Sequence, residues 1–333
     1  MGRSINIALL GNPNTGKTSV FNRLTGLTQK VGNYPGITVE KKEGICKLNR
    51  TTRAHIIDLP GTYSLNASSM DESVVIELLL NKNSKDFPDV AVVVTDVENL
   101  KRNLLLFTQV KDLGIPTLLV INMADQMKRK GISVDLPFLE KKLDTKIALV
   151  STRENQGLDL LKELLLNYRQ LSTQPTIDLY TIDQQYFENL KAAFPNQKLY
   201  KLWLVITQDV NFAKIDRKRV SDATDFRTQS ESELKRLQQK ETVKRYQFIN
   251  EILKVGLFID RDSATDLRSR LDRILIHKFW GYIIFFLILM TVFQSIFDWS
   301  SIPQDFIDTS FAALSELAKT RLPEGVFTSL LAE

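Results

Sequence analysis

Residues 5–18 read INIALLGNPNTGKT, and this stretch decides the fold. Its first half, residues 5–10, is an apolar run typical of a buried strand. Its second half fits the pattern G-x-x-x-x-G-K-[ST] from Gly11 to Thr18. A helical pattern follows over residues 18–24. A strand, a glycine-rich loop and a helix in this order predict a phosphate-binding loop, in which backbone N–H groups and the helix N-terminus close on phosphates.

The side chains of this loop have separate expected roles. Lys17 is expected to reach the β- and γ-phosphates of a nucleotide, and the Thr18 hydroxyl is expected to bind Mg²⁺. A chance glycine-rich turn is the alternative, and the matching strand and helix on either side disfavour it. The residues predicted to contact the nucleotide here are Gly11, Asn12, Pro13, Asn14, Thr15, Gly16, Lys17, Thr18 and Ser19.

A second motif, DLPG at residues 58–61, follows another apolar run. Asp58 can hold Mg²⁺ through water, and the backbone N–H of Gly61 can sense a γ-phosphate. The contacts predicted from this motif are Asp58, Leu59, Pro60 and Gly61.

Two further motifs favour guanine over adenine. The first, NMAD at residues 122–125, follows the apolar run 117–121, and the Asp125 carboxylate can accept two N–H bonds from the guanine edge. Such a site discriminates strongly, because the wrong base leaves buried polar groups unpaired. The second, VSTRENQG at residues 150–157, is expected to cover the base. The predicted base contacts are Asn122, Met123, Asp125, Ser151, Thr152 and Arg153.

Together the motifs resemble those of a known family. They read GNPNTGKT at 11–18, VGNYPGITVEKKEG at 31–44, DLPGTYSL at 58–65, NMAD at 122–125, VSTRENQG at 150–157 and LDRILIHKFWGYIIFFLIL at 271–289. The chain resembles the N-terminal part of the bacterial ferrous iron transport protein B family. The stretch VGNYPGITVE is the most specific, since ordinary small GTPases do not share it. The resemblance implies a Ras-like G domain, a helical domain thought to stabilise the GDP state, and then a polytopic permease.

The resemblance also bears on hydrolysis. Thr62 follows Gly61 where many Ras-like enzymes place a glutamine that orients the attacking water, so intrinsic hydrolysis is expected to be slow. Asn14 matches the asparagine with which family members bind K⁺, and the backbone carbonyls of Gly32 and Tyr34 match the switch I loop that completes that site. Tyr34 departs from the tryptophan that is common there. A turn-forming role is the alternative for Asn14.

Switch I also contains a further expected Mg²⁺ ligand. Thr38 is expected to bind Mg²⁺ in the GTP state, within a loop that can order on GTP and relax after hydrolysis. The nucleotide contacts expected in this loop are Gly36, Ile37 and Thr38. The expected cofactors are GTP or GDP, Mg²⁺ and K⁺. The expected catalytic residues are Lys17, Asn14, Thr38 and Gly61, and the expected Mg²⁺ ligands are Thr18, Thr38 and Asp58.

The composition limits the class of protein. The chain has 333 residues and a formal net charge of +5. A nucleic-acid binder usually has a denser basic patch, so no nucleic-acid partner is predicted. The single cysteine, Cys46, allows no disulfide within the chain, which suits a cytosolic main body.

Alternating apolar runs and helical patterns predict an α/β fold with a doubly wound sheet over residues 1–171. The motifs and the family resemblance imply that this fold is a Ras-like P-loop GTPase domain. Residues 172–270 are expected to form a small all-α spacer domain, with residues 199–206 as its core and solvated charges over residues 231–245. The expected strands are 5–10, 44–49, 53–58, 90–96, 117–122 and 146–150. The expected helices are 17–25, 70–80, 100–113, 136–143 and 158–171.

Residues 271–299 are predicted to contain the first transmembrane helix. Residues 279–297 carry no charge and are long enough to cross a bilayer, with a buried helix of a soluble protein as the alternative. Basic residues precede this run and acidic residues follow it, so the positive-inside rule places the N-terminal domains in the cytoplasm, at the cell inner membrane. Residues 300–333 are expected to lie outside, in a chain that is a fragment of a longer permease.

The predicted function is a GTP-binding and GTP-hydrolysing regulatory module of a membrane ferrous iron transporter, stimulated by K⁺. Two alternatives stay open: an assembly GTPase related to ribosomes or tRNA and tethered to the membrane, and a P-loop ATPase that drives another transporter. The expected partners are the lipid bilayer, the permease beyond residue 333, a small companion iron transport protein and further copies of the chain.

Overall fold

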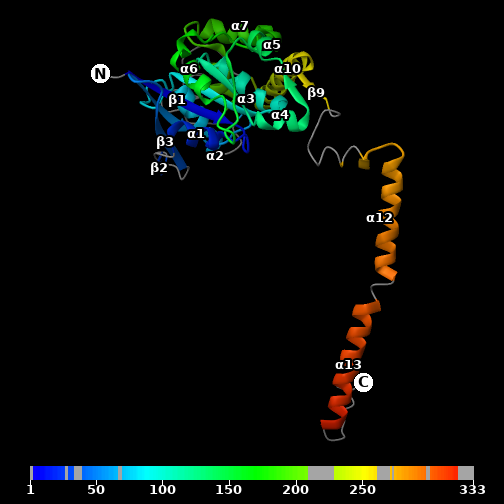
Figure 1. The fold of residues 1–333 in the computed structure, drawn as a ribbon. Coiled ribbons are helices and arrows are strands. Elements are labelled where there is room, and N and C mark those ends of the chain that lie inside the picture. Colours follow the sequence, from blue (N-terminus) through cyan, green and yellow to red (C-terminus); the bar gives the residue numbers. More distant parts are fainter. Residues whose placement is uncertain are drawn as a thin grey trace. The chain divides into compact units, whose positions relative to one another are not determined.

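The structure is a computed structural model, and it describes residues 3–26, 29–33, 40–66, 70–208, 229–260, 271, 274–297 and 301–321. The chain divides into two compact units, Met1–Ala264 and Thr265–Glu333. Figure 1 shows the first unit as a twisted sheet covered by helices. The second unit contains the helices α12 and α13.

The first unit is built on a seven-stranded sheet with the order β2-β3-β4-β1-β5-β6-β8. β1, β4, β5, β6 and β8 run parallel, whereas β3 pairs antiparallel with β4 and β2 pairs antiparallel with β3. The strands are β1 (Arg3–Gly11), β2 (Gln29–Asn33), β3 (Glu40–Lys47), β4 (Thr52–Asp58), β5 (Val90–Asp96), β6 (Thr117–Asn122) and β8 (Ile147–Leu149). This arrangement confirms the predicted α/β class with a parallel sheet.

Helices cover both faces of the sheet, which explains why the central strands are apolar throughout. Successive side chains of a strand point to opposite faces, so Leu9 packs into one core and Leu10 into the other. The core that contains Leu9 is covered by α1 (Lys17–Thr25) and α6 (Leu158–Leu166). The core that contains Leu10 is covered by α2 (Met70–Leu80), α3 (Leu100–Asp112) and α5 (Leu136–Leu143).

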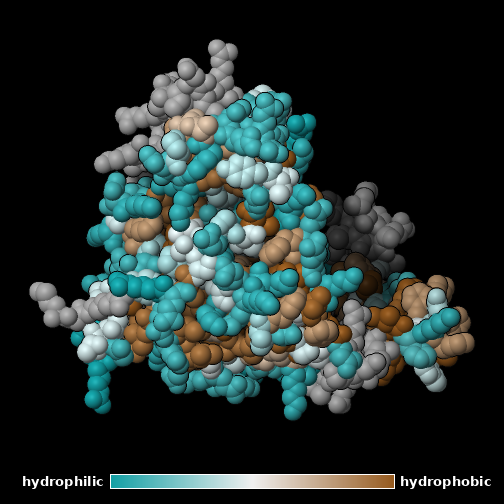
Figure 2. Space-filling model, turned by 90° about the horizontal axis from the view of Figure 1, so that it is seen from above, coloured by the Kyte–Doolittle hydropathy of each residue, from teal (hydrophilic) through white to brown (hydrophobic). Residues whose placement is uncertain are grey.

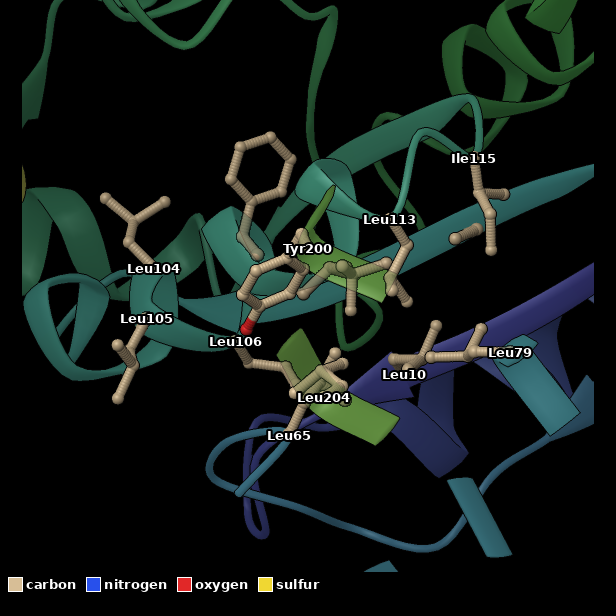
Figure 3. Packing of buried hydrophobic residues seen from close by; sticks show 14 of the residues in the cluster. Leu10, Leu65, Leu79, Leu104, Leu105, Leu106, Leu113, Ile115, Tyr200 and Leu204 are labelled. Atoms are coloured by element: carbon tan, nitrogen blue, oxygen red, sulfur yellow. The ribbon is translucent and has the colours of Figure 1, made fainter. Parts of the chain in front are cut away.

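The helical region joins the core of the sheet instead of enclosing a core of its own. It contains α7 (Gln184–Ala193), α8 (Leu199–Thr207) and α10 (Glu231–Gly256), after the short 3₁₀ turns η1 (Tyr168–Gln170) and η2 (Leu179–Thr181). Tyr200 and Leu204 of α8 belong to the same buried cluster as Leu106 of α3 and Leu10 of β1 (Figure 3). Residues 200 and 202–206 are therefore buried core residues, as expected for this stretch, but the core is shared with the sheet.

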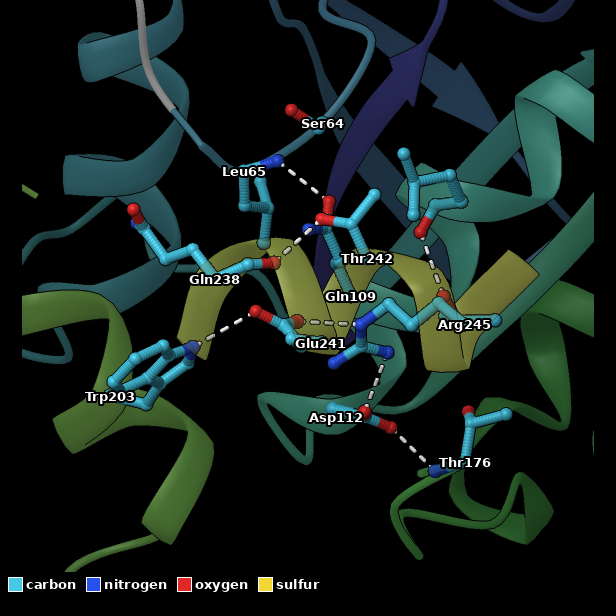
Figure 4. Close-up of polar contacts among 12 residues, drawn as sticks. Ser64, Leu65, Gln109, Asp112, Thr176, Trp203, Gln238, Glu241, Thr242 and Arg245 are labelled. Carbon is cyan, nitrogen blue, oxygen red and sulfur yellow. Dashed lines mark hydrogen bonds and ion pairs between the residues drawn. The ribbon is translucent and has the colours of Figure 1, made fainter. Parts of the chain in front are cut away.

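The stretch 231–245 was expected to be a solvated face, and the structure corrects this for two of its charged residues. Glu241 and Arg245 of α10 have no exposed surface. The Arg245 guanidinium lies 2.8 Å from Asp112 Oδ2 of α3 and donates from Nε to Glu241 Oε1 at 2.7 Å, while Trp203 Nε1 donates to Glu241 Oε2 at 2.9 Å (Figure 4). Buried charges persist where they are paired in this way, and here they join α10 to α3 and α8.

The first unit also contains a separate two-stranded sheet, formed by β7 and β9. β7 (Ile132–Val134) follows α4 (Asp125–Lys130), and β9 (Leu257–Ile259) follows α10. The strands pair antiparallel, with Ser133 opposite Phe258, and Asp260 N donates to Gly131 O at 2.8 Å. The end of the helical region is thereby bound to the α/β part, a contact that the sequence did not predict.

The second unit contains the predicted transmembrane helix. α12 (Trp280–Phe297) has a mean hydropathy of 2.0 and no buried residue, and it alone among the described helices is long and apolar enough to cross a membrane. α13 (Ser301–Arg321) follows it.

Figure 2 shows hydrophilic residues over much of the visible surface, with hydrophobic residues between them.

Candidate nucleotide-binding site

The predicted phosphate-binding loop connects β1, which ends at Gly11, to α1, which begins at Lys17. Gly16 has a φ of 78°, and a Cβ at this position would lie 2.3 Å from Asn122 Nδ2. Only glycine fits there, for both reasons. Asn14 also has a positive φ, of 68°, and it lies exposed at the tip of the loop. The loop thus has the tight, glycine-dependent geometry that a phosphate cradle requires.

Asn12 supports a polar ligand at this loop. Its side chain is buried, with 2% of the residue exposed, and neither Oδ1 nor Nδ2 has a hydrogen-bond partner within the part of the chain that the structure describes. Thr15, by contrast, satisfies its hydroxyl within the loop by donating to Asn12 O at 2.9 Å. A buried amide without a hydrogen-bond partner is costly. A bound nucleotide would remove this cost, because its phosphate oxygens or the polar groups of its base or sugar could pair with the Asn12 amide.

Lys17, Thr18 and Asp58 are brought together as predicted. β4 lies beside β1 with Asp58 opposite Leu9, so the carboxylate reaches the start of α1. Lys17 Nζ forms an ion pair with Asp58 Oδ1, and Thr18 Oγ1 donates to Asp58 Oδ2 at 3.4 Å. Burial lowers the pKa of Lys17 below its ordinary value, although the adjacent Asp58 carboxylate acts in the opposite direction. The desolvation therefore outweighs the pairing, which leaves an ammonium that gains from further negative charge.

The segment after Asp58 lies across the phosphate loop. Thr62 N donates to Gly11 O at 3.2 Å, and a Cβ at Gly61 would lie 3.2 Å from the Pro13 ring. Leu59 N donates to Leu9 O at 3.0 Å while the Leu59 side chain packs into the core, so only its backbone can face a ligand. Gly61 is thus placed beside the phosphate loop, as its predicted role requires.

Asn122 and Asp125 lie on the other side of the phosphate loop. β6 ends at Asn122, whose Nδ2 donates to Thr15 O at 3.0 Å and whose Oδ1 accepts from Thr152 N at 3.3 Å. Asp125 begins α4 and accepts at Oδ1 from Ser151 Oγ at 2.8 Å. The predicted base motifs and the phosphate loop are therefore one hydrogen-bonded assembly. The Ser151 bond, which fixes the direction of the Asp125 carboxylate, was not predicted.

The remaining predicted residues belong to the base motifs or to switch I. Met123 has a φ of 63° and packs against the core, Arg153 is exposed, and Arg23 Nε donates to Thr152 O at 3.0 Å. Gly32 was expected in a loop, but it lies in the edge strand β2 opposite Lys41, because residues 29–33 extend the sheet beyond β3. The predicted switch I residues Tyr34, Gly36, Ile37 and Thr38 lie outside the described residues.

The strand order and the loops at the carboxyl ends of β1, β4, β6 and β8 define a P-loop GTPase fold of the Ras-like class. The sequence profile of Ferrous iron transport protein B matches residues 5–165. The chain belongs to the ferrous iron transport protein B family, as its motifs indicated.

Curated relatives match almost the whole chain. The Fe(2+) transporter FeoB of Leptospira biflexa serovar Patoc is 34% identical over 345 aligned residues, covering 98% of this chain and 49% of that protein. The Fe(2+) transport protein A/Fe(2+) transporter FeoB fusion protein of Porphyromonas gingivalis is 29% identical, covering 100% of this chain and 41% of that protein. The chain therefore spans about half the length of these relatives, or less.

Solved structures match about three quarters of the chain. The cytosolic domain of the T. maritima FeoB iron transporter in a GDP form superimposes with a TM-score of 0.67 at 28% identity, covering 77% of this chain and 100% of that one. The same domain in a GMPPNP form superimposes with a TM-score of 0.66 at 27% identity, covering 76% and 99%.

Proposed function

We propose that this chain is the guanine-nucleotide-binding and GTP-hydrolysing regulatory part of a membrane ferrous iron transporter. Relatives of the family are named Fe(2+) transporters, and the similar T. maritima domain is known in GDP and GMPPNP forms. In this proposal residues 1–171 bind the nucleotide, residues 172–270 form a helical spacer, and the remainder begins the membrane part. The first unit then lies in the cytoplasm, and α12 crosses the inner membrane.

The observation that carries the proposal is the position of Asp125. Its carboxylate is half-buried and accepts from Ser151 Oγ at Oδ1 and from Gln126 Nε2 at Oδ2. The loop that contains Ser151 is bonded to Asn122 through Thr152 N, and Asn122 in turn bonds to the phosphate loop. A carboxylate fixed in this way accepts the two N–H groups of a guanine edge, whereas adenine has no N–H groups at those two positions. This disfavours the alternative of an ATPase.

Several side chains supply the chemistry at the phosphates. Lys17 binds phosphate oxygens, and Asn12 pairs with a phosphate or sugar oxygen through an amide that is otherwise orphaned. Thr18 and Asp58, with Thr38 from switch I, would hold Mg²⁺, which would offset the negative charge of the phosphates. The proximity of Lys17, Thr18 and Asp58 at the phosphate loop supports these proposed roles.

Hydrolysis is slow in this proposal because Thr62 cannot replace the missing glutamine. Thr62 is buried, and its hydroxyl lies 2.7 Å from Ser64 O and 3.1 Å from Glu72 Oε1. The hydroxyl is therefore engaged by Ser64 and by Glu72 of α2, and it does not orient an attacking water. Asn14 and the carbonyls of Tyr34 and of Gly32, which lies near the end of β2, would hold a K⁺ ion, and this ion would supply the compensating positive charge that an arginine finger supplies elsewhere.

The membrane partner and a companion protein complete the proposal. α12 supports contact with lipid, since its apolar side chains are exposed along its length. The fusion protein of P. gingivalis joins an Fe(2+) transport protein A to an FeoB sequence, which supports a small companion protein for this chain.

Asp125→Asn tests the base specificity. The asparagine keeps an acceptor for Ser151 but presents an amide donor to the base, which suits the carbonyl of xanthine. The expected result is a loss of GDP affinity of about 100-fold or more, with xanthosine diphosphate now preferred. Asp159→Asn, at an exposed carboxylate of α6, is the matched control. Equal GDP affinity in both variants, or competition by ADP as strong as by GDP, would overturn the proposal.

A further inference from the structure

Two side chains of α3 contact the segment that contains Gly61: the Arg102 guanidinium lies 4.0 Å from the centre of the Tyr63 ring, and Gln109 bonds to the buried end of the segment. The backbone N–H of Leu65 is buried and donates to Oε1 of Gln109 at 2.8 Å (Figure 4). Gln109 has no exposed surface, and Leu65 is also fully buried. Leu65 ends a stretch that starts at Asp58 and is otherwise anchored to the phosphate loop by Thr62 N on Gly11 O. Gln109 therefore fixes the far end of the stretch that is expected to sense a γ-phosphate.

The nitrogen of the Gln109 amide, unlike its oxygen, forms no hydrogen bond among the described residues. This nitrogen, Nε2, is also buried. An apolar side chain of similar shape would avoid the cost of this orphaned donor. The gain that glutamine brings at this position is the acceptor for Leu65, because a buried N–H without that acceptor would be orphaned in turn.

The helix that carries Gln109, α3, is itself bound to α10 by an ion pair. Asp112 lies three residues further along α3, on the same face of the helix, and pairs with the buried Arg245 of α10. The adjacent Thr108 is also fully buried, but its hydroxyl donates to Leu105 O within α3. Gln109 thus lies on a helix that is itself paired with α10.

We propose that Gln109 is a positioning residue for the segment from Asp58 to Leu65, and that the arrangement it holds favours a nucleoside diphosphate over a triphosphate. The proposal rests on the proposed guanine nucleotide function. In this arrangement Asp58 engages the Lys17 ammonium, and Gly61 lies against Pro13. Either nucleotide needs Lys17, through its β-phosphate, whereas only a triphosphate needs the Gly61 N–H, so the contact of Gly61 with Pro13 must give way for a γ-phosphate alone. A bond that stabilises the present arrangement raises the free energy of that change.

Gln109→Met tests this inference, with Thr108→Val as the matched control on the same helix. Methionine keeps an unbranched buried side chain, but its thioether sulfur is a much weaker acceptor for Leu65 N–H than the amide oxygen. Affinities for GDP and for the non-hydrolysable GMPPNP are measured on the full chain in detergent with fluorescent nucleotides. Hydrogen exchange of the peptide that covers residues 59–66 is measured on the same samples without nucleotide.

The expected result is a shift toward GMPPNP. The preference for GDP over GMPPNP falls about tenfold in Gln109→Met and is unchanged in Thr108→Val. Amides of residues 62–66 exchange faster in Gln109→Met alone. Equal changes in both affinities would show a merely structural role and overturn the inference, and so would unchanged exchange at Leu65. Wild-type chain that binds neither nucleotide would instead refute the proposed function, while the exchange arm would still report on the Leu65 bond.

Discussion

Asn122 Nδ2 donates to the backbone carbonyl oxygen of Thr15 at 3.0 Å, so a residue of the expected base motif also holds the phosphate loop. The other end of the same amide accepts from Thr152 N at 3.3 Å. One buried side chain therefore joins the loops that follow β1, β6 and β8, and the site is already assembled around it.

Asn122→Ala should weaken nucleotide binding as well as the fold. The change leaves the Thr15 carbonyl and the Thr152 N–H without their partner, which costs about 1–3 kcal/mol for a buried group. GDP affinity should fall about tenfold, and the melting temperature should drop. Asn167→Ala is the control, because the Asn167 amide is exposed and bonds only within its own turn. If the two variants behaved alike, Asn122 would not have this joining role.

The stability of the protein should depend on pH through Lys17. Burial lowers the pKa of Lys17 below the ordinary value of 10.5 that it has in the unfolded chain. Between these two pKa values the unfolded state binds more protons, so the free energy of unfolding should rise with pH in that window. The measurement is urea denaturation of wild type and Lys17→Met at increasing alkaline pH, since methionine has no proton to lose. A constant difference between the two proteins would contradict the lowered pKa.

Arg245→Met should be strongly destabilising. Arg245 is fully buried between Asp112 and Glu241, and removing it leaves two carboxylates without their cation. Breaking a buried ion pair in this way costs about 3–5 kcal/mol. Denaturant midpoints measure the effect, with the exposed Arg236→Met of the same helix as control. Adding Asp112→Asn and Glu241→Gln to Arg245→Met should recover part of the loss, and no recovery would argue against the electrostatic explanation.

Asn14→Ala should remove a stimulation of GTP hydrolysis by K⁺. Asn14 is exposed at the tip of the phosphate loop with a positive φ, where its side chain can bind a cation beside the phosphates. Hydrolysis is compared in K⁺ and in Na⁺ at equal ionic strength. The wild-type chain should be faster in K⁺ and the variant equally slow in both salts. Equal wild-type rates in the two salts would remove this role from Asn14.

The long helices were predictable because their apolar periodicity and the residues at their ends both lie within one continuous stretch of sequence. The helices expected at 17–25, 70–80 and 136–143 have those bounds in the structure. Local signals explain two of them: α1 lies between Gly16 and Gly26, both with positive φ, and Asp135 accepts from Phe138 N at the start of α5. The helix expected at 158–171 ends at Leu166, where a 3₁₀ turn replaces its last part.

The elements that the sequence did not predict depend on distant partners. β7 and β9 have three residues each, too few for a periodic pattern, and they exist because they pair with each other. The burial of Arg245 depends in the same way on Asp112 of α3, far from it in the chain. A charged helical stretch read without these partners resembles a solvated face.

The site was more predictable than these contacts, since parallel strands bring their carboxyl ends to one edge of the sheet. Gln109 could not be found in this way, because α3 has no motif and the contact with Leu65 spans 44 positions.

Phosphate release from GTP and from ATP by the full chain, with Lys17→Met as the inactive control, tests the central claim most directly. The account predicts slow release from GTP, little or none from ATP, and loss of the GTP activity in the variant. Turnover of ATP at the rate of GTP, or GTP turnover that persists without Lys17, would contradict it.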